Sequence, residues 1–184
     1  MTRLLALLAI LFVAACAREA PVAAGPGGPF QLIDQNGRPA TESLLKGRWS
    51  AVFFGFTYCP DFCPTTLQAL KAAETELGPK AKDLQVVFIS VDPERDTPAA
   101  LKAYVSNDAF PEGTIGLTGT PEQVAAAAKA YRAYFKKTGE GQDYLVDHTA
   151  AVYLMNPKGE FVRVLAGGMT PTEMATQIRD AMRG

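Results

Sequence analysis

The sequence predicts an α/β fold in which helices flank a central mixed sheet. Residues 51–57 and 84–91 are nearly continuous apolar runs with β-branched and aromatic side chains, which is typical of strands buried on both faces of a sheet. Between them, residues 65–77 carry apolar side chains at helical spacing. A strand, a helix and a second strand in this order form a βαβ unit, so we expect the two strands to be parallel with a right-handed crossover.

Turn and capping signals predict the elements around this unit. Residues 30–34, followed by the turn sequence Gln-Asn-Gly at 35–37, indicate a short hairpin that opens the domain. Three helices should each begin after a capping threonine that is followed by proline, at Thr97, Thr120 and Thr170. The last two of these starts also carry Gln or Glu at the position that completes a capping box.

A second hairpin is predicted before the last helix, because residues 150–155 and 161–165 flank the turn sequence Asn-Pro-Lys-Gly at 156–159. The complete order of elements matches a thioredoxin-like α/β sheet with an N-terminal hairpin and an inserted helix/loop region. The sequence shows no internal repeat, so we predict that residues 30–184 form one domain.

This topology brings three chemically active residues to one end of the sheet. Cys59 follows the first parallel strand, and Asp92 follows the second. His148 lies in the loop before a strand that should run antiparallel to both. All three residues should therefore emerge at the same end of the sheet, which is the end that ligand sites in open α/β sheets favour.

Residues 1–15 are predicted to be a signal peptide. Arg3 precedes the apolar run 4–13, which is far shorter than the ~20 residues needed to span a bilayer, and small residues lead into Cys16. This pattern resembles a bacterial lipoprotein signal, in which Cys16 would carry the lipid; an ordinary secretory signal with an incidental Cys16 is the alternative. Residues 16–29, rich in Ala, Gly and Pro, would then be a flexible tether. The predicted location is the bacterial cell envelope, with the domain on the extracytoplasmic side of a membrane.

The charge of the chain limits the classes of partner. Its 184 residues have a formal net charge of −1 at pH 7, with 18 basic and 19 acidic side chains. A protein that binds nucleic acid, or a membrane through a polybasic surface, needs an excess of positive charge. We therefore expect no nucleic-acid partner.

The most informative motif places Cys59 and Cys63 four residues apart, directly after the first buried strand. At the start of a helix they fall on one face, one turn apart. Two thiols this close can share a metal ion or form a disulfide. A disulfide that closes so short a loop adds little stability, so we interpret the pair as functional. The helix dipole and its free N–H groups should lower the thiol pKa values.

His148 is the only histidine of the chain and is expected beside the cysteine pair. Two thiolates and one imidazole are a soft set of three ligands that favours copper: thiolates favour Cu(I), and imidazole accepts both Cu(I) and Cu(II). A structural zinc site needs four ligands, and Asp92 or Asp147 would have to supply the fourth. We also expect Asp147 or a backbone carbonyl to orient His148 through its second ring nitrogen. Asp92 is expected to shape the site or to contact a partner.

Three motifs together closely resemble the Sco/SenC family. They are residues 57–64 (TYCPDFCP), 90–98 (SVDPERDTP) and 147–149 (DHT). The resemblance implies a membrane-anchored, thioredoxin-like protein outside the cytoplasm that binds copper and serves assembly of the binuclear copper centre of cytochrome c oxidase. It also implies that Cys59, Cys63 and His148 are the copper ligands. Many members are anchored by a transmembrane helix, whereas this chain is predicted to carry a lipid.

Two functions are compatible with these residues. The leading hypothesis is a metallochaperone that passes copper by ligand exchange to the copper-centre subunit of cytochrome c oxidase, with other periplasmic copper carriers or thiol reductants as further partners. The alternative is a thiol–disulfide oxidoreductase that reduces the oxidase's copper-ligand cysteines, a reaction that needs neither metal nor His148. A peroxiredoxin-like peroxidase is less well supported, because Pro60 stands where that family has threonine. A non-catalytic binding module leaves the three convergent ligands unexplained.

Overall fold

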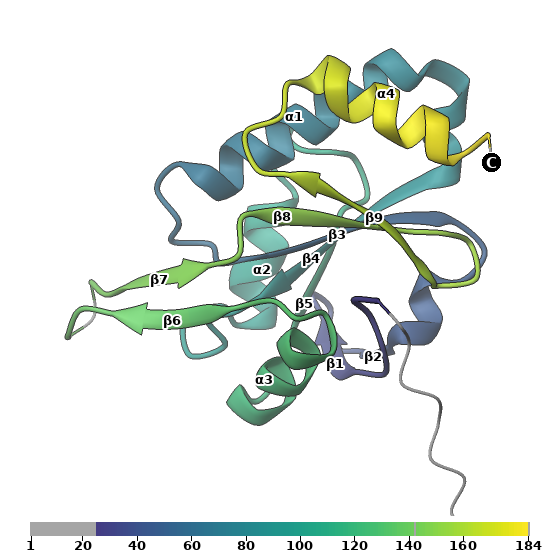
Figure 1. The fold of residues 1–184 in the computed structure, drawn as a ribbon. Helices are drawn as coiled ribbons and strands as arrows, with labels where there is room; N and C mark the ends of the chain where they lie inside the picture. The colour runs from purple at the N-terminus through teal and green to yellow at the C-terminus, as the bar shows by residue number, and fades with distance from the viewer. Residues whose placement is uncertain (1–24, 142, 184) are drawn as a thin grey trace, which may run out of the picture.

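The computed structural model describes residues 25–141 and 143–183, and its centre is a seven-stranded mixed sheet (Figure 1). The strand order is β2-β1-β5-β4-β3-β8-β9. These strands are β1 (Gln31–Asp34), β2 (Pro39–Thr41), β3 (Trp49–Gly55), β4 (Leu84–Ser90), β5 (Ile115–Thr118), β8 (Ala151–Met155) and β9 (Phe161–Ala166). The predicted α/β fold with a mixed sheet and flanking helices is confirmed. The predicted signal peptide and the lipid-bearing Cys16 lie outside the described residues, as does the first part of the tether.

The strand pairing follows from the βαβ unit. β3 pairs parallel to β4, with Phe53 opposite Phe88, and β4 pairs parallel to β5. β8 runs antiparallel to β3 and continues into the antiparallel β9. The first hairpin, formed by β1 and β2, joins the sheet through β5. The C-terminal ends of β3 and β4 therefore lie side by side, next to the start of β8.

Helices cover both faces of the sheet. They are α1 (Phe62–Leu77), α2 (Pro98–Val105), α3 (Pro121–Ala130) and α4 (Pro171–Ala181), with short 3₁₀ turns η1 (Glu42–Leu45) and η2 (Gly78–Asp83). Buried residues of α1, α2 and α4 pack with Phe53 and Phe88 on one face, while those of α3 pack with Phe54 and Ile89 on the other. Consecutive strand residues point to opposite faces, so each central strand supplies side chains to both layers of the core.

The predicted helix starts are confirmed by their capping contacts. Thr97 accepts a hydrogen bond from Ala100 N, while Thr120 and Thr170 each form a complete capping box. A cap of this kind contributes about 1 kcal/mol. α1 begins at Phe62, three residues earlier than its apolar periodicity predicts.

β6 (Phe135–Thr138) and β7 (Leu145–His148) form a two-stranded sheet of their own, which extends away from the main sheet (Figure 1). Neither strand was predicted, and His148 was expected in a loop, whereas it is the last residue of β7. Most side chains of β6 are exposed, so this strand lacks the apolar run that marks a buried one. The short β5 was also not predicted.

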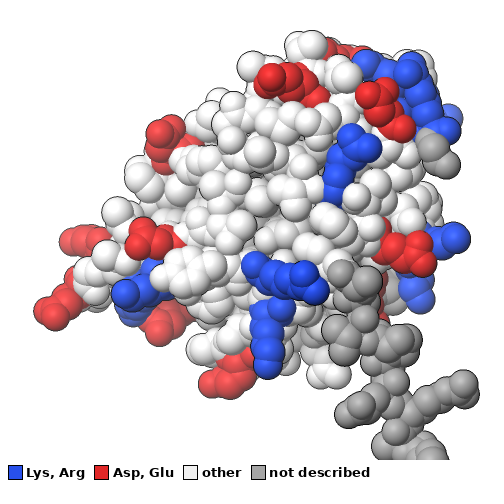
Figure 2. All heavy atoms as spheres, in the orientation of Figure 1, with Lys and Arg blue, Asp and Glu red and all other residues white. Residues whose placement is uncertain are grey.

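The charged side chains of the described residues are interspersed on the face drawn in Figure 2, where red and blue groups are separated by wide uncharged areas. This mixed distribution agrees with the small net charge of the chain. Within the described residues, no helix has the length and apolar character required to cross a bilayer.

Candidate metal centre

The two cysteines lie where β3 leaves the sheet and α1 begins. Cys63 is fully buried in the first turn of α1, and Cys59 is half-buried in the turn before it. The backbone N–H of Cys63 donates to Cys59 Sγ at 3.3 Å, so the start of the helix directs one of its free N–H groups at that sulfur. Gly55 makes room for the second sulfur, because a Cβ at this position would lie 2.7 Å from Cys63 Sγ.

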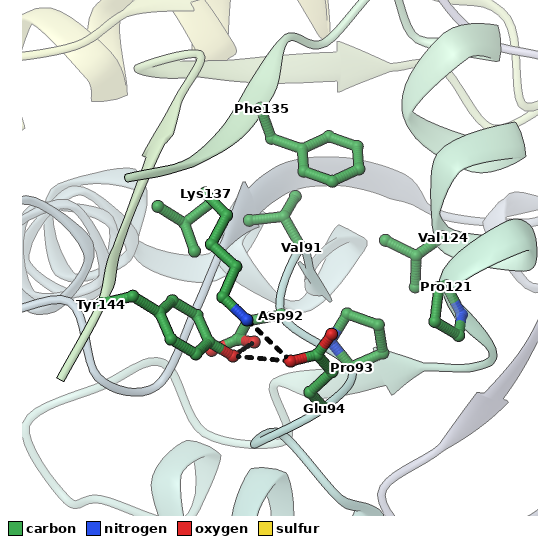
Figure 3. A pocket seen from close by; sticks show the side chains of 10 residues that line it. Val91, Asp92, Pro93, Glu94, Pro121, Val124, Phe135, Lys137 and Tyr144 are labelled. Atoms are coloured by element: carbon green, nitrogen blue, oxygen red, sulfur yellow. Dashed lines mark hydrogen bonds and ion pairs between the residues drawn. The ribbon is translucent and has the colours of Figure 1, made fainter. Parts of the chain in front are cut away.

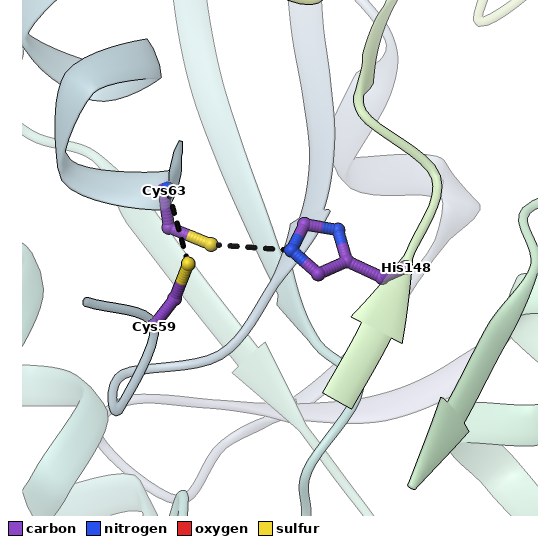
Figure 4. A group of neighbouring side chains, drawn as sticks. All are labelled: Cys59, Cys63 and His148. Carbon is purple, nitrogen blue, oxygen red and sulfur yellow. Dashed lines mark hydrogen bonds between the residues drawn. The ribbon is translucent and has the colours of Figure 1, made fainter. Parts of the chain in front are cut away.

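His148, at the end of β7, completes a cluster of three ligand atoms that all lie within 4.8 Å of one another (Figure 4). Its Nε2 is 3.5 Å from Cys63 Sγ, and its Nδ1 is 3.2 Å from the carbonyl oxygen of Thr149. A proton on Nδ1 donated to this carbonyl leaves the lone pair of Nε2 directed at the sulfurs. The backbone carbonyl is therefore the group placed to orient the ring.

The imidazole is enclosed by aromatic rings. The ring centroids of Phe53, Phe56 and Phe62 lie 6.1, 5.8 and 6.0 Å from that of His148, all with edge-type geometry. These rings restrict the tilt of the imidazole and keep much of its surface from water. An ion bound at Nε2 would therefore sit at the boundary between the aromatic core and the solvent.

The two thiols have opposite electrostatic surroundings. The pKa of Cys59 is lowered to about 5, chiefly by a hydrogen bond from the Cys63 side chain. Backbone N–H groups of Cys63 and Asp61 add to this effect, and partial burial opposes it. The hydrogen bond to Cys59, together with burial, raises the pKa of Cys63. In the reduced, metal-free protein the outer sulfur is therefore a thiolate at neutral pH and the inner sulfur keeps its proton. A metal ion that bound both would displace that proton.

Asp96 holds the cysteine loop against the end of β4, and sequence reasoning missed it. Its buried carboxylate accepts hydrogen bonds from Thr57 N at 3.0 Å, from Thr57 Oγ1 at 2.6 Å and from Ser90 Oγ at 2.6 Å. Burial raises the pKa of Asp96, against hydrogen bonds that favour the charged form. The sequence does place this acid just before the capping Thr97, in a dense polar loop. An acidic residue in such a loop is ordinarily expected to be exposed, so its burial was not predicted.

The two aspartates predicted around the site lie outside the group of three ligands. Asp92 is buried, with Oδ1 accepting from the hydroxyl of Tyr144 and Oδ2 from Arg95 Nε, both at 2.5 Å. Asp147 is exposed, and its Oδ2 accepts from Thr138 Oγ1 at 3.0 Å across the hairpin. Neither aspartate is placed as a fourth metal ligand. Of the two groups expected to orient His148, Asp147 or a backbone carbonyl, the structure shows the carbonyl of Thr149.

The donor set fits a soft ion of low coordination number. Two sulfurs and one imidazole nitrogen suit Cu(I), whereas a closed structural zinc site takes four protein ligands. A surface hollow lined by Cys59, Leu145 and His148, among others, leaves the site open on one side. A ligand from a second molecule can therefore approach the ion without unfolding the domain.

Comparison with known proteins gives close matches. Protein SCO2 of Saccharomyces cerevisiae, a mitochondrial protein, is 44% identical over 161 residues, which cover 85% of this chain and 53% of that protein. The crystal structure of Arabidopsis thaliana ScoI with copper bound has a TM-score of 0.80 at 42% identity, covering 85% of this chain and 98% of that one. The structure of Bradyrhizobium japonicum ScoI with copper bound has a TM-score of 0.76 at 44% identity, covering 85% and 99%. The chain spans about half the length of the curated relatives it matches.

These relatives correct the predicted location. The sequence was interpreted as that of a protein of the bacterial cell envelope. The curated relatives from yeast, Arabidopsis and human are mitochondrial proteins, and they point to a mitochondrial location instead. The interpretation, which rested on a short N-terminal pattern, is contradicted by these mitochondrial relatives.

The match to the family extends over nearly the whole domain. A family model described as SCO1/SenC matches residues 19–183, a range that includes both cysteines of the motif and the histidine. The solved relatives share the sheet and its flanking helices over 85% of the chain. The sequence match and the shared fold together show that this chain belongs to the SCO1/SenC family.

Proposed function

We propose that this protein is a copper chaperone that binds one copper ion through Cys59, Cys63 and His148. The observation that carries the proposal is the convergence of three soft ligand atoms, from two distant parts of the chain, to within 4.8 Å of one another. The relatives from Arabidopsis, Bradyrhizobium and yeast whose structures contain copper support it. The resemblance to the family further supports the binuclear copper centre of cytochrome c oxidase as the destination of the ion.

The geometry suits an ion that must be held and then released. Cys59 offers a thiolate at neutral pH because its pKa is lowered to about 5, and Cys63 contributes a second sulfur once it loses its proton. His148 presents Nε2 to the same point. Three protein ligands leave Cu(I) open to a fourth from a partner, so the ion can pass by stepwise ligand exchange with no free ion in solution.

The test is copper binding by the reduced protein and by three ligand variants. Cu(I) is titrated anaerobically into the wild type, Cys59→Ser, Cys63→Ser and His148→Ala in competition with a chromophoric chelator. X-ray absorption then counts the sulfur and nitrogen neighbours. We expect one ion with two sulfurs and one nitrogen in the wild type, and losses of affinity of at least about tenfold in each variant.

Asp147→Asn is the matched control, because this side chain is exposed and its hydrogen bond runs across the hairpin to Thr138, away from the ligand cluster. It should bind copper as the wild type does. Retention of wild-type affinity in all three ligand variants would show that the ion binds elsewhere.

A second candidate function is reduction of a disulfide, and the difference in accessibility between the two sulfurs favours it. Cys59 is half-buried with a lowered pKa, and the buried Cys63 lies directly behind it. The Cys59 thiolate attacks a client disulfide, forming a mixed disulfide and releasing the client's other sulfur as a thiolate that takes up a proton. Cys63 then loses its proton and attacks Cys59, which leaves a Cys59–Cys63 disulfide and a client dithiol. Each reduced protein thus passes two electrons to one client disulfide.

Substitution of His148 distinguishes the two functions. Disulfide reduction needs no imidazole, so His148→Ala should reduce an oxidised peptide that carries the client's cysteine pair at the wild-type rate in the presence of a copper chelator. Loss of that activity in His148→Ala, or its dependence on added copper, would remove the reductase as a separate function.

A further inference from the structure

The sheet that carries His148 depends on contacts outside itself. Within the part of the chain that the structure describes, β6 and β7 pair only with each other, and a two-stranded hairpin is at best marginally stable in water. The position of the imidazole relative to the two sulfurs is therefore set by whatever fastens this hairpin to the rest of the domain.

From Tyr144, the residue before β7, to His148 at its end, every second side chain points toward the domain. Tyr144 and Val146 are buried and His148 is half-buried, whereas Leu145 and Asp147 between them are exposed. Because side chains alternate along a strand, the three inward residues lie on one face, about 13 Å from the first to the last. A fastening at Tyr144 is thus transmitted along a short, extended segment to the metal ligand.

Tyr144 is held by contacts with the loop that follows β4. Its hydroxyl donates to Asp92 Oδ1 at 2.5 Å, and Asp92 is only 3% exposed (Figure 3). Two cations lie over its ring: Arg95 Cζ and Lys137 Nζ are each 3.6 Å from the centroid. Cation–π contacts this short, combined with a buried hydrogen bond to a carboxylate, give the ring one defined position.

Arg95 connects this arrangement to the cysteine side of the site. Its Nε donates to Asp92 Oδ2 at 2.5 Å, and its Cζ lies 4.6 Å from the ring centroid of Tyr58. Tyr58 directly precedes Cys59 and is 61% exposed. One guanidinium therefore contacts both the residue next to the first cysteine and the residue directly before the strand that carries the histidine.

We propose that Asp92, Arg95 and Tyr144 form a clasp that sets the position of the His148 imidazole over the two sulfurs. The three are positioning residues, since none belongs to the ligand cluster. The effect of the clasp on copper rests on the proposed copper site, whereas its effect on the position of the imidazole does not. The predicted role of Asp92 in shaping the site would then be to hold Tyr144 and Arg95 in place.

The first measurement needs no metal. His148 is the only histidine of the chain, so its ring protons give a single set of NMR signals. The phenylalanine rings around it displace these signals from the values of a free histidine. In the reduced, metal-free protein, Tyr144→Leu should move them toward the free values, and Tyr144→Phe should move them less, because it removes only the hydroxyl. Tyr134→Leu, a substitution of a 59% exposed tyrosine just before β6, should leave them in place.

The second measurement tests whether Tyr144 acts through His148. Cu(I) affinity is determined for the wild type, Tyr144→Leu, His148→Ala and the double variant, by competition with a chromophoric chelator. Outer-shell partners of metal ligands typically contribute 10–100-fold in affinity, so we expect a loss of about that size in Tyr144→Leu. In the His148→Ala background the same substitution should cost less than about twofold, because the residue it positions is gone.

The outcomes distinguish the two proposals. Unchanged His148 signals in Tyr144→Leu, or equal losses of affinity in the presence and absence of His148, would overturn the clasp while leaving the copper site intact. A wild type that binds no copper but whose His148 signals move in Tyr144→Leu would refute the copper site and retain the clasp as a device that positions the imidazole. Should Tyr144→Leu fail to fold, Tyr144→Phe and the cycle built on it decide the question, with smaller shifts expected.

Discussion

Replacing Gly55 by alanine should displace the sulfur of Cys63, because Cys63 packs against this glycine. An added Cβ would lie 2.7 Å from Cys63 Sγ, and 2.8 and 3.1 Å from two ring atoms of Phe88. Atoms in ordinary contact are about 3.5–4.0 Å apart, so the sulfur and the ring must each move by roughly 1 Å. Both are fully buried, which leaves them little space in which to move.

The expected cost follows from this overlap. Overpacking of a close-packed core costs about 1–3 kcal/mol, which lowers the melting temperature by roughly 2–12 °C for a domain of this size. Because a metal ligand must be held within about 0.5 Å of its productive position, displacement of the sulfur should also weaken Cu(I) binding about tenfold or more. The assays are thermal unfolding of the reduced, metal-free protein and competitive Cu(I) titration.

Gly116→Ala is the matched control. Gly116 is also a buried strand glycine, but its added Cβ would lie 3.3 Å from Val105 Cγ1 and 3.4 Å from Leu101 Cβ, which requires shifts of only a few tenths of an ångström. It should bind copper with unchanged affinity and unfold close to the wild-type temperature. Wild-type copper affinity and stability in Gly55→Ala would refute the argument that this glycine exists to make room for the sulfur.

Three further predictions concern the surroundings of the site. Asp96→Ala should lower the free energy of unfolding by about 2–4 kcal/mol, because the N–H and hydroxyl of Thr57 lose a buried acceptor. Asp96→Asn should lower it less, and urea unfolding compares the two variants. In the metal-free, reduced protein, iodoacetamide should modify Cys59 well before Cys63 at pH 7. The rate at Cys59 should fall as the pH drops through about 5, where its thiolate takes up a proton. Peptide mass spectrometry locates the label, and faster reaction at Cys63 would contradict the assignment of the thiolate. Thr120→Ala should cost about 1 kcal/mol by removing the cap of α3 without altering copper affinity, and a change in affinity would show that the cap influences the distant site.

Elements with local signals were predicted well. The two parallel strands are marked by apolar runs, and the starts of α2, α3 and α4 by a threonine and a proline that act within one helical turn. Such signals depend on neighbours in sequence, so they can be recognised before any tertiary contact is known. The convergence of Cys59, Cys63 and His148 was also predicted, because it follows from the direction in which each strand runs.

The hairpin that carries His148 had no such signal. Its strand β6 is largely exposed, and the hairpin is stabilised by Tyr144, which lies far along the chain from Asp92 and Arg95. Asp92 was recognised as important, but a carboxylate buried under a tyrosine cannot be distinguished in sequence from one that faces a metal. Asp96 was overlooked for the same reason, since its partners Thr57 and Ser90 come from the ends of two different strands.

The amino-acid order alone therefore specified the chemistry of this protein: two thiols one helical turn apart, one imidazole, and a sheet whose topology directs all three to the same end. Folding in three dimensions decided which sulfur is the accessible thiolate, which carbonyl orients the imidazole, and what holds the histidine hairpin in place. The difference is physical, because periodicity and capping act over a few residues, whereas burial, pKa and the pairing of polar groups depend on neighbours that only the folded chain brings together.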